Sequence, residues 1–186
     1  MLKMHTKKPI SRCKRGSTAI EFAILAPILI MMLVGVIEFG LVFTASVLLQ
    51  GAVGTVSRMG KTGFVPPGQT QDAYIRSQIS ALTGGYLDAS KLTIQMEWYR
   101  GIDSVGQPEP CYVAVCTSAS PPGTYDDVNG NGQWDADQGS PGLGTGGNAV
   151  LYTVSYPWPL EGLIASIVNK KTLTISAVAV VQNEAY

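Results

Sequence analysis

The chain opens with one long apolar stretch and continues with shorter stretches in which apolar and polar residues alternate. From Phe22 to Ser57 the only ionisable residue is Glu38. A helix of about 20 apolar residues crosses the hydrocarbon core of a bilayer, and residues 22–43 meet that length. The pattern therefore predicts a membrane-spanning helix near the start of the chain.

The apolar pattern does not stop where a membrane span would end. It continues with lower hydrophobicity through residues 47–56, and Val65-Pro66-Pro67-Gly68 ends it. We therefore expect one helix over residues 17–62, longer than a membrane requires. Its second half should leave the membrane and pack on a domain formed by residues 63–186.

Four segments of that domain show a periodic pattern. Residues 71–82 have irregular helical spacing and predict a short amphipathic helix. Residues 91–100 alternate strictly, which predicts a half-buried strand. Residues 149–156 and 172–181 are two further strand candidates, and the last is β-branched on both faces, so we place it centrally in the sheet.

The connecting segments are less regular. Pro157 and Pro159 are expected to end the strand before them, and residues 160–168 form a short helix or an ordered turn. Residues 101–147 have little apolar periodicity and predict a long loop. The predicted class is α+β: a long N-terminal helix packed on an antiparallel sheet of about three strands, with one extra short helix.

Charge divides the chain sharply, although its formal net charge is zero. Residues 1–16 carry six basic residues and no acid, whereas the remainder has seven basic and thirteen acidic residues. A basic segment before an apolar span stays in the cytoplasm, so the rest of the chain should lie on the other side of the membrane. The net negative remainder also argues against nucleic-acid binding.

The cysteines follow the same division. Cys13 lies in the basic segment, where its thiol should stay reduced. Cys111 and Cys116 lie five positions apart in the long loop. Outside the cytoplasm they are expected to form a small local disulfide, and the alternative is two unpaired structural cysteines.

The residues at the start of the apolar stretch suggest processing. Gly16 directly precedes Ser17-Thr18-Ala19-Ile20, and a lone Glu21 lies five residues after the glycine. An ordinary secretory signal has a shorter apolar region followed by a small-residue cleavage site, which this stretch lacks. The arrangement resembles a prepilin signal. The resemblance implies that a prepilin peptidase cuts between Gly16 and Ser17, removes a cytoplasmic leader of residues 1–16, and leaves the helix on the mature protein.

The resemblance covers both ends of the chain. Residues 16–40, with Ala-x-Glu-Phe at their start and Ile-Glu-Phe-Gly later, and residues 177–186 are similar to TadE-like proteins of the Tad (Flp, type IVb-like) pilus. Major pilins of this system typically have tyrosine where this chain has Phe22, so the resemblance implies a minor pilin or pseudopilin. Expected partners are other pilins and pseudopilins, the prepilin peptidase and the Tad inner-membrane assembly platform, in pili that serve surface adhesion and biofilm formation.

Two carboxylates in the apolar helix allow different interpretations. A charge in lipid usually has a partner, and the resemblance implies that Glu21 pairs with the new α-amino group of Ser17 on the same or a neighbouring subunit. Alternatively, Glu21 stabilises the start of its own helix. Glu38 lies about 24 Å beyond Phe22 at 1.5 Å per residue, so it is either an interfacial carboxylate or a contact with another pilus component.

The long loop contains a run of oxygen-bearing side chains. Counted from Asp127, the residues Asp127, Asn129, Asn131, Gln133 and Asp135 take the ligand positions 1, 3, 5, 7 and 9 of an EF-hand-like loop. Position 12 is Gln138, and the nearby acid is Asp137. The residues 127–138 predict a weak Ca²⁺ site, and the alternative is a turn rich in Asn and Asp side-chain hydrogen bonds.

Residues for common enzyme chemistry are missing. The only histidine, His5, lies in the segment expected to be removed, so a Ser-His or Cys-His system lacks its base. The glycine-rich residues 142–147 follow no predicted strand of a nucleotide-binding motif. We therefore expect a structural protein, a minor pilin of the bacterial inner membrane that joins a pilus. The alternative is a permanently membrane-anchored, calcium-dependent adhesin.

Overall fold

The structure is a computed structural model that describes residues 14–61, 65–160, 165–166 and 168–184. It contains a long helix α1 (Lys14–Gly60), a second helix α2 (Gln71–Leu82), two 3₁₀ turns and four strands. The strands are β1 (Thr93–Tyr99), β2 (Ser140–Pro141), β3 (Ala149–Pro159) and β4 (Thr172–Gln182). The predicted α+β class, with one long helix, one short helix and an antiparallel sheet, is confirmed. The chain divides into two compact units, Met1–Gly40 and Leu41–Tyr186.

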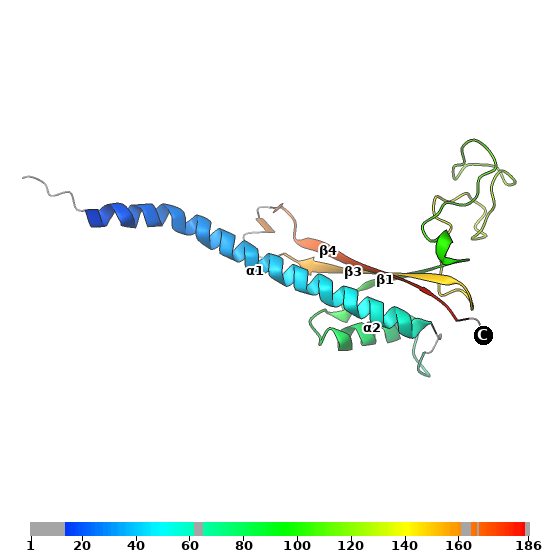
Figure 1. Ribbon diagram of the computed structural model, residues 1–186, viewed down its shortest axis with the longest axis horizontal. Helices are drawn as coiled ribbons and strands as arrows, with labels where there is room; N and C mark the ends of the chain where they lie inside the picture. Colours follow the sequence, from blue (N-terminus) through cyan, green and yellow to red (C-terminus); the bar gives the residue numbers. More distant parts are fainter. Residues whose placement is uncertain (1–13, 62–64, 161–164, 167, 185–186) are drawn as a thin grey trace, which may run out of the picture. The chain divides into compact units, whose positions relative to one another are not determined.

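The four strands form one antiparallel sheet in the order β2-β1-β3-β4 (Figure 1). The three predicted strands are present, and the two-residue β2 within the long loop adds a fourth. The prediction that the last strand lies centrally is wrong, because β4 forms an edge and β3 lies between β1 and β4. The apolar residues on the outward face of β4, Val178 and Val180, remain substantially exposed.

Strand β3 continues through both prolines that were expected to end it. Its pairing with β1 reaches only Ser155, whereas its pairing with β4 continues to Pro159. The next residue, Leu160, donates its N–H to the Lys171 carbonyl on the β4 side. Because N–H groups alternate in direction along a strand, those of positions 157 and 159 would point away from β4. At that point no described strand flanks β3, so the missing proline N–H groups break no ladder bond.

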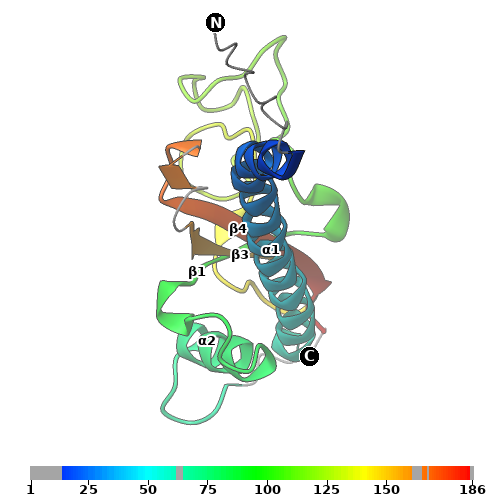
Figure 2. The same ribbon diagram turned by 90° about the vertical axis from the view of Figure 1, so that its left-hand side faces the viewer.

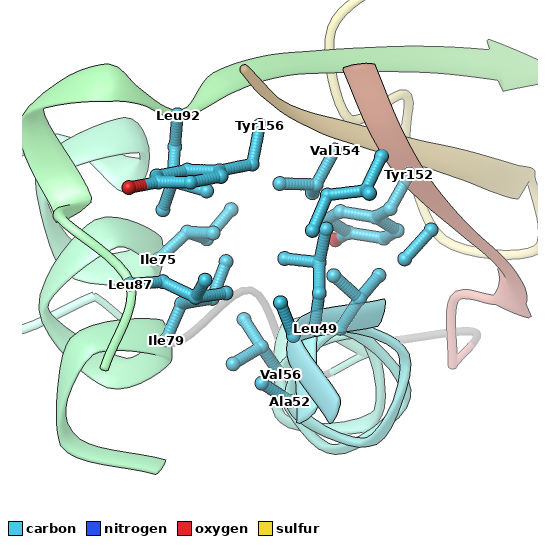
Figure 3. Packing of buried hydrophobic residues seen from close by; sticks show 14 of the residues in the cluster. Leu49, Ala52, Val56, Ile75, Ile79, Leu87, Leu92, Tyr152, Val154 and Tyr156 are labelled. Carbon is cyan, nitrogen blue, oxygen red and sulfur yellow. The ribbon is translucent and has the colours of Figure 1, made fainter. Parts of the chain in front are cut away.

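The core of the Leu41–Tyr186 unit lies between the sheet and the two helices. The C-terminal part of α1 contributes fully buried Ala45 and Leu49, and α2 contributes Ile75 and Ile79. Figure 3 shows Leu49, Ile75 and Ile79 directed into the space between the helices and the strand that carries Tyr152 and Val154. Figure 2 shows α2 beside α1. The C-terminal part of α1 and the amphipathic helix α2 thus cover one face of the sheet, as the apolar spacing in each helix requires.

Local sequence explains the ends of α2. Thr70 caps its N-terminus by accepting a hydrogen bond from the Ala73 N–H, and Asp72 lies in the first turn. Arg76 pairs with Asp72 and also donates to the carbonyls of Ala89 and Leu92, which ties α2 to the start of β1. The segment 160–168, expected to be a short helix or turn, lies largely outside the described residues.

Candidate functional site

The first half of α1 is an apolar helix with its side chains uncovered. Its large apolar residues from Ile20 to Phe39 are 39–76% exposed. The helix from Thr18 to Gly60 is long and apolar enough to cross a membrane, and no residue of its most apolar stretch is buried against the described part of the chain. Exposing this much apolar surface to water is unfavourable. A bilayer or other apolar helices must therefore cover this half of α1.

Helical periodicity places the predicted assembly residues along this helix. Gly16 and Ser17 lie within its first turn, which begins at Lys14. Glu21 is exposed and is followed by Phe22, which is 66% exposed, whereas Glu38 is half-buried. Glu21 and Glu38 are 17 residues apart, so they lie on different faces and about 25 Å apart along the axis. Both belong to the Met1–Gly40 unit.

This helix carries the likeness to a known protein family. Residues 16–58 match the family model of TadE-like proteins.

The TadE-like segment begins at the glycine that precedes the apolar stretch and ends two residues before the end of α1. The resemblance read from the sequence is therefore confirmed for these residues. A TadE-like segment is pilin-like and relates the chain to the Tad pilus. Comparisons with curated proteins and with solved structures found no match.

The long loop is the second candidate site, and it leaves the sheet where Tyr99 pairs with Ala149. Cys111 and Cys116 form a disulfide in this loop, with their Cα atoms 5.9 Å apart. An isolated bridge joins Cys111 to Tyr125, which is buried. These links give the loop a fixed course although it contains little regular secondary structure.

Four of the six proposed calcium ligands lie together at the turn of the loop. Asp127 accepts hydrogen bonds from the backbone N–H groups of Gly130, Asn131 and Gly132. Asp135 accepts from the side-chain amides of Asn129 and Asn131 through the same oxygen, Oδ2. The turn uses Gly130 and Gly132 at φ of 77° and 80°, a region that favours glycine.

The other two proposed ligands lie differently. Gln133 donates its backbone N–H to Asn131 Oδ1, so it directly follows the turn. Asp137 instead accepts a hydrogen bond from the Tyr99 hydroxyl at 3.2 Å and from the Gly139 N–H. Burial and the Asp137 carboxylate both raise the pKa of Tyr99. Among the described residues, no three His, Cys, Asp or Glu side chains are grouped closely enough to hold a metal.

A residue that the sequence reasoning missed organises this loop. Glu109 is 1% exposed, and its Oε1 accepts from the N–H groups of Val128 and Asn129 at 2.7 and 3.3 Å. Its Oε2 accepts from the Asp135 N–H at 3.1 Å, and its carbonyl accepts from Trp134 Nε1 at 2.9 Å. The only signal in the sequence is a lone acid between Pro108 and Pro110. Glu109 holds both flanks of the turn in place.

Proposed function

We propose that the protein is a minor pilin (pseudopilin) that takes part in assembling a Tad-type pilus for surface adhesion and biofilm formation. The observation that carries the proposal is the TadE-like match over a helix whose apolar side chains are uncovered from Ile20 to Phe39. The proposed role is structural and not enzymatic. Its partners are other pilins, the prepilin peptidase and the inner-membrane assembly platform.

The proposed location follows from α1. The basic residues 1–16 remain in the cytoplasm, the apolar half of α1 crosses the inner membrane once, and the Leu41–Tyr186 unit lies in the periplasm. After cleavage behind Gly16, the same helix joins a bundle of pilin helices. Apolar residues at helical spacing, such as Leu29, Met32, Leu33, Val36 and Ile37, supply the surface for that bundle.

Replacing Glu21 with glutamine tests the assembly step. In the proposal the carboxylate pairs with the α-amino group of Ser17 in an apolar bundle. Removing one partner of such a desolvated pair costs about 2 kcal/mol or more, roughly a thirtyfold loss of association. Cross-linking of membranes and detection of the protein on the cell surface should therefore show loss of multimers and of display.

The matched control is Glu97→Gln, which makes the same chemical change in β1, outside the apolar half of α1. It should leave both measurements unchanged. Glu38→Gln decides between the two interpretations of that residue, because only a contact with a pilus component makes assembly sensitive to it. Unchanged multimers in Glu21→Gln would contradict the proposed assembly role.

We further propose that the loop 127–138 binds Ca²⁺, because four of its oxygen-bearing side chains already lie together. Extracellular modules bind calcium with Kd of about 0.1–1 mM, so roughly 10 mM calcium would stabilise the folded loop by about 1.4–2.7 kcal/mol. Titration of the full chain should change the emission of Trp134, whose indole is bonded to the Glu109 carbonyl, and should slow exchange of the loop amides. Magnesium serves as the ion control.

Asp135→Ala should abolish that calcium response, and Asp103→Ala in the 3₁₀ turn Ile102–Ser104 should preserve it. This comparison separates binding in the turn from general screening of an acidic loop. If wild-type Trp134 emission and amide exchange stay constant at millimolar calcium, the loop is a turn held by Asn and Asp side chains alone.

A further inference from the structure

The end of the sheet where β3 ends and β4 begins carries a partly open aromatic cluster. Trp158 pairs with Leu173 across the two strands, and the ring of Tyr86 lies 5.7 Å from the ring of Trp158. Tyr86 is 40% exposed and Leu173 is 41% exposed. Trp158 packs against the core, whereas Tyr86 and Leu173 present aromatic and apolar surface to the surroundings.

Two lysines lie beside this cluster. Lys170 and Lys171 are exposed and directly precede β4. The backbone there is held by bonds from Lys170 N–H to the Ala165 carbonyl and from Leu160 N–H to the Lys171 carbonyl. Within the described part of the chain neither lysine forms a salt bridge. Glu161, in the same connection, lies outside the described residues.

Among the described residues that follow Tyr86, the first acid is Asp88, and its carboxylate is already engaged. Asp88 follows Tyr86 by two residues and accepts hydrogen bonds from the backbone and hydroxyl of Ser90. It also pairs with Lys91 at 3.7 Å. This end of the unit thus presents aromatic rings, an apolar side chain and two lysines; we refer to Tyr86, Trp158, Leu173, Lys170 and Lys171 as the aromatic–lysine end.

The aromatic–lysine end lies on the side from which α1 enters the Leu41–Tyr186 unit. The end of α1 contacts the middle of β3, since a Cβ at Gly60 would overlap the Tyr152 hydroxyl, and the Glu184 N–H bonds to the Lys61 carbonyl beyond the end of β4. α1 and β4 therefore run in the same direction, as Figure 1 shows. The start of β4 then lies at the level where α1 enters the unit.

Standard dimensions relate this end to Phe43, the last residue of the apolar stretch, which lies in the same Leu41–Tyr186 unit. From Tyr152 to Trp158 a strand rises about 20 Å, which equals about 13 residues of helix. Counted back from Gly60, and allowing for the length of the Tyr152 side chain, Trp158 lies near the level of residues 43–47, where the apolar stretch ends. The headgroup region is about 5–7 Å thick on each side of a bilayer. A bilayer surface at Phe43 would therefore bring its headgroups to the level of the aromatic–lysine end.

We infer that the aromatic–lysine end rests on anionic phospholipid headgroups of the membrane that α1 crosses. Trp and Tyr side chains favour this depth, since their rings are apolar and their N–H or O–H groups are polar. Lysines close to a bilayer are attracted to anionic lipids. A lipid partner is favoured over another protein because Val42 and Phe43, the last residues of the apolar stretch, belong to the same Leu41–Tyr186 unit, and Val42 packs against the same core as Trp158. The inference rests on the proposed anchoring by α1 and does not depend on entry into a pilus.

Fluorescence quenching in vesicles tests the contact. The full chain is reconstituted in vesicles of phosphatidylcholine with phosphatidylglycerol, with a headgroup-labelled quenching lipid. One variant, Trp98→Phe with Trp134→Phe, keeps only Trp158. The matched variant, Trp98→Phe with Trp158→Phe, keeps only Trp134, which lies in the loop that leaves the opposite end of the sheet. Thermal unfolding of both variants verifies that they are folded.

We expect loss of most of the Trp158 emission and no loss of the Trp134 emission. Adding Lys170→Gln and Lys171→Gln, or using phosphatidylcholine alone, should reduce the quenching of Trp158. Equal quenching of Trp158 and Trp134 would overturn the inference, and so would quenching that is insensitive to both lipid charge and the lysines. Flotation of the chain with the vesicles tests anchoring separately, so a chain that floats with Trp158 unquenched refutes only this contact.

Discussion

Replacing Gly16 with alanine should leave most of the protein uncut at the Gly16–Ser17 bond, so that residues 1–16 stay attached to the protein in the membrane fraction. The Gly16–Ser17 bond lies in the first turn of α1, whereas a peptidase must hold the chain extended to reach it. Alanine stabilises a helix interior by about 1 kcal/mol relative to glycine. In the proposed cleavage, the added methyl group must also fit the peptidase subsite that receives Gly16, and such overpacking costs about 1–3 kcal/mol. Together the two effects slow cleavage by roughly one to three orders of magnitude.

Mass spectrometry of the N-terminus measures this outcome directly. Ser17→Ala is the matched control, because it also strengthens the first turn but adds no bulk at the glycine position, and it should be cut as the native chain is. A native chain that keeps residues 1–16 in cells containing the peptidase would refute processing. Efficient cutting of Gly16→Ala behind residue 16 would refute the role assigned to the glycine.

Replacing Glu109 with alanine should release the acidic loop while the sheet stays folded. The substitution removes the acceptor of three backbone N–H groups, those of Val128, Asn129 and Asp135. Each unsatisfied group costs about 1–3 kcal/mol, reduced where water can enter, so a local loss of about 3–5 kcal/mol is expected. Hydrogen exchange of those three amides should accelerate by more than about a hundredfold, since 1.4 kcal/mol is a factor of ten.

Two variants make this result specific to the buried carboxylate. Asp126→Ala removes an acid of the same loop whose ion pair with Arg100, at 4.0 Å, is largely exposed, so it should change exchange by less than about tenfold. Glu109→Gln keeps the shape of the side chain but turns an amide donor toward one of the N–H groups. Its loop amides should exchange faster than those of Asp126→Ala and more slowly than those of Glu109→Ala. Unchanged exchange in Glu109→Ala would show that Asp127 alone holds the turn.

The strongly periodic segments were predictable from the sequence. The short helix 71–82 has the predicted bounds, and the alternation of residues 91–100 led to β1 because every second side chain meets the core. The long apolar stretch likewise led to α1 and to the TadE-like segment. In each case one local pattern determines both the element and the face that it buries.

Features that depend on neighbouring strands were not predictable. The apolar residues on both faces of β4 suggested a central strand, yet Val178 and Val180 lie on an outward face. Pro157 and Pro159 remain in β3 because β1 stops short of them, which no pattern within β3 reveals. Glu109 was missed for a related reason: its partners lie 19–26 residues further along the chain.

The pairing of Tyr99 with Ala149 has a consequence for how such a domain diversifies. The long segment between these two residues leaves the β1–β3 ladder at Tyr99 and returns to it at Ala149, and the two positions are about 5 Å apart. A short tight turn could join the same two positions and leave β1, β3 and β4 paired, although it would remove β2. Segments of other lengths and chemistry can therefore be exchanged here by insertion or deletion at little topological cost, while the core between α1, α2 and β3 is retained.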